Sequence, residues 1–393
     1  MFHAQSPLPH LAISQLADQN KVHNAQLGHR VSQLFQTGAQ SPQPRIMRLP
    51  QAPSILIILM GALGDVARGL CLVSHIKNHF PQSSLSWLVE PPWAEIIRQH
   101  HQLDNIIVFD RPKWRQGVRD IYRRLSTVHF DCVLDLQRHF KSGLFSFFTR
   151  AQCRIGFHPL EAKEGNWLFN NRHLQRQGND LPKIFHYLKF AEALGLESPN
   201  QLDFGLSHLN IQSLNPGLAS GLDQPYWVVI LGSTWETKEW LADNYRELIR
   251  EILYSTDMQI VLVDAKGKYG LACSLEQQIN NPRLLNLVGR TSVVELAAVL
   301  QSAQGAVGPD CGAGHIASAV HTPYVSLFGP TSHVRTAPFQ SEHLVVTTDA
   351  ECAPCYKKKC PGKNKACMQG IGVSQVMDKI SLARSGNKVR HVE

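Results

Sequence analysis

The stretch ILIILMGALGD, residues 55–65, decides the fold class of this chain. Its first six residues are apolar without interruption, which is typical of a parallel β-strand that is buried on both faces. The glycines at positions 61 and 64 predict a turn, and we expect a helix over residues 66–80. A buried strand, a glycine turn and a helix in this order begin a βαβ unit, so the stretch predicts an α/β fold.

The same alternation extends on both sides of a loop-like stretch at 205–225. Before it, we expect strands at 85–89, 106–109 and 132–136, helices at 94–100, 115–125 and 181–195, and a less regular region from residue 154. After it, we expect strands at 227–231, 259–263, 284–287, 305–307 and 324–328, and helices at 242–253, 272–280, 293–303 and 314–320. This alternation predicts two doubly wound, Rossmann-like domains with a substrate cleft between them, at the carboxyl ends of their strands.

The expected organisation has four parts. Residues 1–52 form a polar, flexible extension, residues 53–210 the first domain, residues 211–350 the second, and residues 351–393 a loop rich in Cys and Lys followed by a helix. The composition, 43% hydrophobic and 18% charged, is that of a soluble globular protein. We see no apolar run of membrane-spanning length and no signal peptide, so a cytoplasmic location is expected.

The charge of the chain predicts an anionic partner. The formal net charge is +8, with 19 histidines besides, which suits nucleic acid, acidic lipid or a phosphorylated sugar. A basic run with interleaved aromatic residues is either a solvated face or a surface for an anionic acceptor or acidic membrane. Nucleic acid ranks third because the chain has no recognised nucleic-acid module. The run comprises Arg111, Lys113, Trp114, Arg115, Arg119, Tyr122, Arg123 and Arg124.

Residues 305–331, GAVGPDCGAGHIASAVHTPYVSLFGPT, contain the first candidate site. Asp310, Cys311, Gly312 and His315 surround the expected start of a helix, where free N–H groups and the helix dipole favour a phosphate. Asp310 would repel a phosphate but could accept hydrogen bonds from the hydroxyls of an attached sugar. The pattern therefore suggests a nucleotide-sugar site, and the alternative is a helix capped by Asp310 with His315 packed beneath it.

Two further side chains carry possible chemistry. Asp65 is either a simple helix N-cap or a carboxylate at the end of a strand that takes a proton from an acceptor hydroxyl. Lys238 is either a solvated loop lysine or a cation that neutralises a diphosphate leaving group. Four close cysteines could hold zinc, although their spacing is not that of paired C-x2-C knuckles, or could form a redox-sensitive basic loop. These are Cys352, Cys355, Cys360 and Cys367.

These motifs, in this order, resemble those of glycosyltransferase family 9, the ADP-heptose:lipopolysaccharide heptosyltransferases, over residues 54–380. The resemblance begins with the G-x-x-G-D turn at 61–65 and continues with LDLQ at 134–137 and KS at 141–142. The loop at 233–240 is similar to the family's lysine-tryptophan loop, and residues 308–320 to its D-[ST]-G-x-x-H-x-x-A-A signature. LFGPT at 327–331 and the cysteine-rich tail complete the series.

The resemblance implies a two-domain GT-B fold and an inverting, metal-independent transfer of heptose from ADP-heptose to the inner core of lipopolysaccharide. It makes Asp65 the general base, without cofactor or bound metal. The implied donor residues are Lys238, Ser233, Thr234, Asp310 (for the heptose), Cys311, Gly312 and His315. The implied acceptor residues are Arg111, Lys113, Arg115, Gln137, Lys141, Arg150 and Arg172. The enzyme would act peripherally at the inner face of the cytoplasmic membrane, and nucleic acid is not expected as a partner.

The sequence also departs from the family pattern. Cys311 replaces the usual Ser or Thr, so a phosphate contact there would fall to the backbone N–H. Arg138-His139 stands where glycine is usual, and residues 264–267 lack the expected glutamate. The alternatives are therefore a non-catalytic sugar-nucleotide or anionic-glycan binding protein of this fold, or a related transferase with another donor or acceptor. A nicotinamide-dependent oxidoreductase is disfavoured because G-x-G-x-x-G is absent at the first turn.

Overall fold

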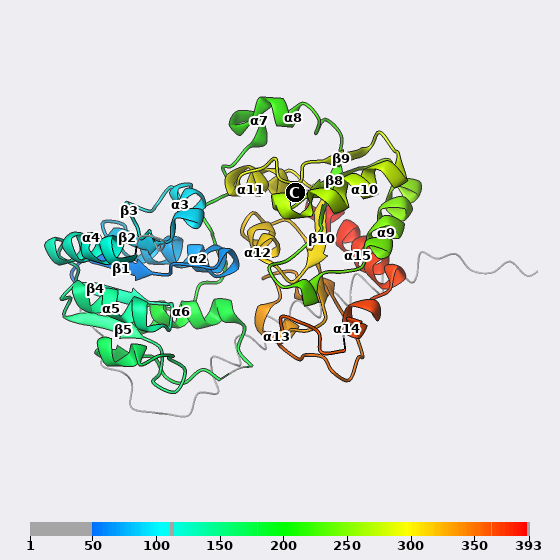
Figure 1. Cartoon of the computed structure of the whole chain (residues 1–393). Helices are drawn as coiled ribbons and strands as arrows, with labels where there is room; N and C mark the ends of the chain where they lie inside the picture. Colours follow the sequence, from blue (N-terminus) through cyan, green and yellow to red (C-terminus); the bar gives the residue numbers. More distant parts are fainter. Residues whose placement is uncertain (1–48, 111–113, 179, 363, 391–393) are drawn as a thin grey trace, which may run out of the picture. The chain divides into compact units, whose positions relative to one another are not determined.

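The apolar run at residues 55–60 becomes β1, a central strand of the first of two parallel sheets (Figure 1). The structure is a computed structural model that describes residues 49–110, 114–178, 180–362 and 364–390. For residues 114–115 and 386–390 it describes the backbone only. Most of the predicted N-terminal extension, residues 1–52, therefore lies outside the described residues.

The first sheet has six strands in the order β3-β2-β1-β4-β5-β6. Its strands are β1 (Ser54–Ile58), β2 (Ser84–Val89), β3 (Asn105–Val108), β4 (Cys132–Asp135), β5 (Cys153–Gly156) and β6 (Arg172–His173). The helical segments between and after them are α2 (Leu63–His79), α3 (Pro91–Arg98), α4 (Trp114–Thr127), α5 (Phe140–Phe148), η1 (Asn166–Phe169) and α6 (Lys183–Ala193). Side chains of β1 alternate between two hydrophobic clusters, Ile55 and Ile57 in one and Leu56 and Ile58 in the other. This confirms that the run is buried on both faces.

The second sheet also has six strands, in the order β12-β11-β10-β7-β8-β9. Its strands are β7 (Tyr226–Ile230), β8 (Gln259–Val263), β9 (Leu284–Asn286), β10 (Gly305–Pro309), β11 (Tyr324–Phe328) and β12 (Val345–Thr347). The longer helices are α9 (Ala242–Ser255), α10 (Tyr269–Ile279), α11 (Val293–Gln301), α12 (Gly312–Ala319) and α15 (Val373–Arg390). Short helical segments are α7 (Ile211–Leu214), α8 (Pro216–Ala219), η2 (Glu236–Lys238), η3 (Lys266–Lys268), α13 (His333–Thr336), η4 (Glu342–Leu344) and α14 (Ala366–Gln369).

Each sheet has one point at which the order of its strands reverses. In the first sheet this point lies between β1 and β4, and in the second between β10 and β7. Ligands of open α/β sheets bind outside the carboxyl ends of the strands at such points. Asp65 and Gln137 follow β1 and β4, while Ser233 and Asp310 follow β7 and β10. The topology thus places the candidate residues at the two positions where a ligand is expected.

The two irregular stretches contain short elements that were not predicted. The less regular region from residue 154 includes most of β5 and all of β6, and the loop-like stretch at 205–225 contains α7 and α8. These elements have only two to four residues each, too few to show a period. The helix expected over 66–80 begins at Leu63, and the one expected over 314–320 begins at Gly312. In both cases the glycine-containing turn residues already belong to the helix.

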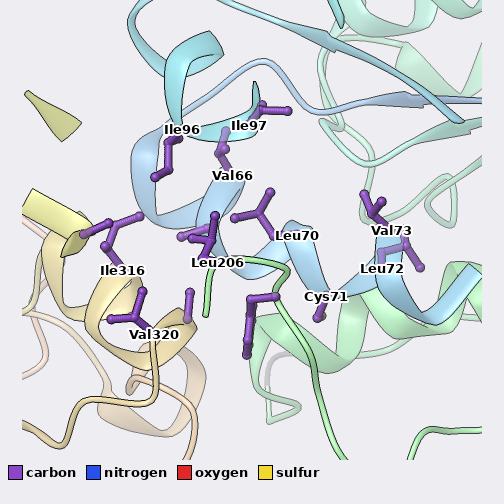
Figure 2. Packing of buried hydrophobic residues seen from close by; sticks show 14 of the residues in the cluster. Val66, Leu70, Cys71, Leu72, Val73, Ile96, Ile97, Leu206, Ile316 and Val320 are labelled. Carbon is purple, nitrogen blue, oxygen red and sulfur yellow. The ribbon is translucent and has the colours of Figure 1, made fainter. Parts of the chain in front are cut away.

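Helices α2 and α12 pack directly against each other. Figure 2 shows Val66 and Leu70 of α2 in one hydrophobic cluster with Ile316 of α12 and Val320, the C-cap of that helix. A Cβ atom on Gly64 would lie 2.7 Å from Cδ2 of His315, closer than carbon atoms approach in proteins. The absence of a side chain at Gly64 therefore lets the start of α2 approach the histidine on α12.

Candidate functional site

Asp65 lies in the first turn of α2 and does not cap the helix. The N-cap is Ala62, which makes no side-chain capping hydrogen bond, so the capping interpretation of Asp65 was wrong. Instead, its Oδ1 atom accepts hydrogen bonds from the Arg68 guanidinium at 2.5 Å, the Lys183 ammonium at 3.0 Å and the Tyr187 hydroxyl at 3.0 Å. The carboxylate is thus the centre of a cluster built from α2 and α6.

The charges of this cluster hold Asp65 in its ionised form. Burial alone would raise the pKa of Asp65, but the neighbouring Lys183 and Arg68 cations outweigh it and hold that pKa far below its usual range. Burial lowers the pKa of Lys183, and Asp65 opposes that effect. Burial raises the pKa of Tyr187, and the nearby Asp65 carboxylate adds to the rise. At neutral pH the cluster therefore offers an ionised carboxylate with a phenol as its neutral donor.

Arg68 also joins this cluster to α12, because its guanidinium hydrogen-bonds Nε2 of His315. A guanidinium has only N–H donors, so Nε2 must be the acceptor. Burial, followed by the nearby Arg68 charge, lowers the pKa of His315 well below its ordinary value, which makes the ring neutral. Its proton then sits on Nδ1, a buried atom without a hydrogen-bond partner in the described structure. His315 is 5% exposed and presents one unused N–H donor.

Asp310 follows β10 and forms a buried ion pair with Lys238. Its Oδ2 atom lies 2.6 Å from the Lys238 ammonium and accepts a hydrogen bond from Thr331 at 2.7 Å. Ser233 donates to the backbone carbonyl of Asp310 at 3.2 Å. The N-cap of α12 is Cys311, so the interpretation of Asp310 as a cap was wrong. Lys238 is not a solvated loop lysine either, since its side chain is only 14% exposed.

The Cys311 thiol occupies the start of α12, where the sequence predicts an anion site. Burial raises the pKa of Cys311, while the contact with the Tyr324 hydroxyl and the N–H groups of Gly314 and Ala313 lower it. The sulfur lies 3.6 Å from the Tyr324 hydroxyl oxygen. Cys311 is therefore a neutral thiol. The backbone N–H groups beside it could instead donate hydrogen bonds to an anion such as phosphate.

Asp65 lines a cavity of about 130 Å³ together with Gln137, Lys183 and Tyr187. The Gln137 amide accepts from the N–H of Met60 at 2.7 Å and donates to the carbonyl of Gly61 at 3.1 Å. It therefore holds the turn that presents Asp65. The remaining lining residues are Leu59, Leu136, Arg138, His139, Phe157, Lys163, His186 and Arg335.

The other predicted acceptor residues lie apart from that lining. Lys141 forms an ion pair with Glu90 at 2.7 Å, Arg150 donates to the Tyr122 hydroxyl at 3.3 Å, and Arg172 is an exposed residue of β6. Thr234, predicted for the donor, is exposed. Arg111, Lys113 and the side chain of Arg115 lie outside the described residues.

In the cysteine-rich segment, Cys352, Cys355 and Cys367 form no disulfide. Among the described residues, no group of three or more His, Cys, Asp or Glu side chains is placed to hold a metal ion. Within the same part of the chain, no helix is long and apolar enough to cross a membrane.

Four residues of the site were not predicted from the sequence: Arg68, Lys183, Tyr187 and Thr331. Two weak signals were present. Lys183 and Tyr187 are four residues apart on α6, and Asp65 and Arg68 are three apart on α2, so each pair shares a helix face. No local pattern, however, shows that these two helices meet around one carboxylate.

Comparison with known sequences gives a consistent result. The sequence profile "Glycosyltransferase family 9 (heptosyltransferase)" matches residues 118–366. The lipopolysaccharide core heptosyltransferase OpsX of Haemophilus influenzae is 25% identical over 309 residues, covering 77% of this chain and 87% of that protein. The lipopolysaccharide heptosyltransferase 1 of Pseudomonas aeruginosa is 28% identical over 322 residues, covering 78% of this chain and 87% of that protein.

Solved structures show the same fold. The Escherichia coli heptosyltransferase WaaC with ADP-2-deoxy-2-fluoro heptose has a TM-score of 0.66 at 23% identity, covering 84% of this chain and 99% of that one. The Escherichia coli ADP-heptose lps heptosyltransferase II has a TM-score of 0.69 at 18% identity, covering 85% and 99%. These likenesses confirm the GT-B arrangement of two parallel α/β sheets.

Proposed function

Because this chain belongs to glycosyltransferase family 9, the heptosyltransferases, we propose that it transfers heptose from ADP-heptose to the inner core of lipopolysaccharide with inversion and without a metal. The observation that carries the proposal is the link through Arg68, which contacts both Asp65 and His315. Asp65, the candidate base, lies beside the point where the strand order of the first sheet reverses. His315, a candidate hydrogen-bond donor to phosphate, lies beside the corresponding point of the second sheet.

The donor would bind at the start of α12. His315 offers its Nδ1–H, Gly312 and Cys311 their backbone N–H groups, and Lys238 its ammonium to the diphosphate, which is favoured by the positive end of the helix. Ser233 and Thr234 lie in the loop that carries Lys238, and Asp310 would accept hydrogen bonds from the heptose. The related WaaC was solved with ADP-2-deoxy-2-fluoro heptose, which supports an ADP-heptose donor here.

In the proposed reaction Asp65 acts as the general base. It takes the proton of the acceptor hydroxyl while that oxygen bonds to the anomeric carbon and the bond from this carbon to the diphosphate breaks. The electron pair leaves with ADP, whose growing negative charge is met by Lys238, by the helix N-terminus and by the N–H of His315. One direct displacement of this kind inverts the anomeric configuration.

The acceptor would enter from the side of the first sheet. Gln137 shapes the turn beside Asp65, and Lys141, Arg150 and Arg172, with Arg111, Lys113 and Arg115, would meet the anionic groups of the acceptor. Residues 53–210 would then be the acceptor domain and residues 211–350 the donor domain. Because the acceptor is carried by a lipid, we place the enzyme at the inner face of the cytoplasmic membrane, bound peripherally.

A transfer assay with ADP-heptose and a Kdo-terminated inner-core acceptor tests the proposal. We expect product in the presence of EDTA, and Asp65→Ala to lower turnover by about 10²- to 10⁴-fold with donor affinity nearly kept. A thermal-shift screen across ADP-, GDP- and UDP-sugars tests the donor, since a ligand at about 100 times its Kd adds about 2.7 kcal/mol of stability. Donor binding without turnover in the wild type, or wild-type turnover in Asp65→Ala, would contradict the mechanism.

A further inference from the structure

We infer that α5 and η1 carry a surface that seats on an anionic lipid bilayer. This α5–η1 surface consists of Phe140, Phe147, Trp167 and Leu168. Their exposed fractions are 48%, 54%, 41% and 67%, although large apolar side chains are usually buried. Four of them on two adjacent helical segments form a concentration of exposed apolar area that marks an interaction site.

Phe140 and Phe147 of α5 contact η1, the segment that also carries Trp167 and Leu168. The ring of Phe169 in η1 makes edge contacts with Phe140 at 5.1 Å and with Phe147 at 6.3 Å between centroids. Gly143 of α5 permits this approach, because a Cβ atom there would lie 2.9 Å from both the Asn166 carbonyl oxygen and the Phe169 ring. The absence of a side chain at Gly143 thus lets η1 lie directly on α5.

The surface is held in place from below by a buried carboxylate. Asn166 and Asn170 donate to Oδ2 of Asp135 at 2.6 and 3.1 Å, and Asp135 is fully buried at the end of β4. These hydrogen bonds fix η1 to β4. The apolar side chains of the α5–η1 surface are therefore held in exposed positions. A fixed apolar surface fits a bilayer interface, in which aromatic residues are favoured.

The charge around the surface favours an anionic membrane. Residues 136–178 carry seven Lys and Arg residues and two Glu residues. Of the cations, Lys141 is paired with Glu90, and Arg138 and Lys163 line the cavity of Asp65, which leaves Arg150, Arg154, Arg172 and Arg176. The Arg154 guanidinium lies 5.7 Å from the centre of the Phe147 ring, and Arg150 and Arg172 follow the two helical segments. The acidic groups are Glu161 and Glu164, and Glu164 accepts from the N–H of Phe140 at 3.2 Å. A second copy of the chain would bring two such basic surfaces together, whereas acidic headgroups attract them.

The α5–η1 surface also adjoins the cavity of Asp65. His139 and Lys163 line that cavity, Phe140 follows His139 directly, and Lys163 lies three residues before η1 begins. Seating this surface on a bilayer would bring the mouth of the cavity to the headgroup layer. This last step rests on the proposed function, since only a lipid-borne acceptor needs the cavity at that height.

Vesicle flotation of the full chain tests the inference. We expect the protein to bind phosphatidylcholine vesicles that contain about 30 mol% phosphatidylglycerol, to bind pure phosphatidylcholine much less, and to be released by about 0.5 M NaCl. The double variant Phe147→Ser/Leu168→Ser should bind the anionic vesicles at least about tenfold more weakly. Tyr254→Ser is the matched control, because Tyr254 is 95% exposed on α9, in the half of the chain that forms the second sheet. Vesicle binding by this variant should stay within about twofold of the wild type.

Unfolding temperatures of the variants close to that of the wild type establish that folding is intact. Wild-type protein that ignores anionic vesicles, or a double variant that binds them as the wild type does, would overturn the inference. The wild type could instead sediment as a dimer and not bind vesicles, while the double variant sediments as a monomer. That result would show that the surface contacts a second copy of the chain.

Two acceptors separate this inference from the proposed function. The double variant should transfer heptose normally to a soluble, lipid-free acceptor and poorly to the same glycan embedded in vesicles. Absence of transfer to both acceptors by the wild type, with vesicle binding intact, would reject the proposed function and leave the α5–η1 surface standing.

Discussion

The guanidinium of Arg68 on α2 donates a hydrogen bond to Nε2 of His315 on α12. The same guanidinium contacts the Asp65 carboxylate at 2.5 Å. This cation therefore fixes the proton of the imidazole on Nδ1 and, together with Lys183, holds the neighbouring carboxylate ionised. Two groups with different proposed roles, one toward the donor and one toward the acceptor, depend on a single side chain.

Replacing Arg68 should disturb both groups at once. Burial and then the Arg68 charge lower the pKa of His315, so in Arg68→Met burial alone remains and the ring protonates at Nε2 more readily than in the wild type. We expect about tenfold weaker ADP-sugar binding, equivalent to about 1.4 kcal/mol, and a binding curve that acquires a pH dependence below neutrality. Calorimetric titration across pH measures both. Arg98→Met, which removes an exposed arginine of α3, is the control, and unchanged binding in Arg68→Met would refute the coupling.

The Lys183 charge should set the acid limb of activity. Lys183 and Arg68 lower the pKa of Asp65 against the effect of burial, so the ionised base persists to low pH. In Lys183→Met the pKa of Asp65 rises, and the acid limb of the kcat/KM profile should move to higher pH by at least about one unit. Lys189→Met on the same helix, where Lys189 pairs with Glu192, should leave the limb in place. A limb that does not move in Lys183→Met would exclude Asp65 as its source.

The buried Lys238–Asp310 pair should matter for stability before any ligand binds. Lys238→Met leaves the Asp310 carboxylate buried with Thr331 as its partner, and we expect a loss of about 3–5 kcal/mol in the free energy of unfolding. Adding Asp310→Leu should recover most of that loss because no unpaired charge remains. Arg246→Met, which breaks a pair with the largely exposed Asp243, should cost less than about 1 kcal/mol. Urea unfolding distinguishes the three variants, and equal costs for Lys238→Met and Arg246→Met would contradict the argument.

Acid should destabilise the protein through buried histidines. Burial lowers the pKa of His100 to about 4 and that of His186 to about 4, with the charges of His101 and Arg138 adding to the effect. The unfolded chain therefore binds more protons between pH 6.5 and 4, and stability falls as the pH drops through this window. Each group contributes about 1.4 kcal/mol per pH unit within it. His100→Gln should reduce the dependence of the free energy of unfolding on pH by about 1.4 kcal/mol per pH unit. His129→Gln, at an exposed position, should leave that dependence unchanged. Urea unfolding at pH 5 and pH 7 provides the comparison.

Much of the fold could be predicted from local patterns. The apolar runs at 55–60 and 227–231 became β1 and β7 because a strand buried on both faces needs no polar residues. Short elements escaped prediction, since the two residues of β6 are held by pairing with β5 rather than by their own composition. The starts of α2 and α12 were displaced by three and two residues, because a glycine turn and a first helical turn have the same composition. The helices expected from residues 242 and 293 begin at those positions.

The candidate site was predictable only in part. Asp65, Lys238, Asp310 and His315 were singled out from their positions after strands, and the structure places two of them in an ion pair and two around Arg68. Lys183 could not be paired with Asp65 in advance, because 118 residues separate them along the chain. Such contacts are set by how α2 and α6 pack, which no local spacing encodes.

The glycines between α2 and α12 restrict how this enzyme can diverge. A Cβ on Gly64 would lie 2.7 Å from Cδ2 of His315, and a Cβ on Gly312 would lie 2.9 Å from the Cβ of Leu63. A single methyl group at either position would therefore force the two helices apart and stretch the hydrogen bond from Arg68 to His315. A descendant with a new sugar specificity would have to change the walls of its binding site while keeping both glycines. Directed evolution should accordingly randomise the loops after β7 and β4 and leave these two positions fixed.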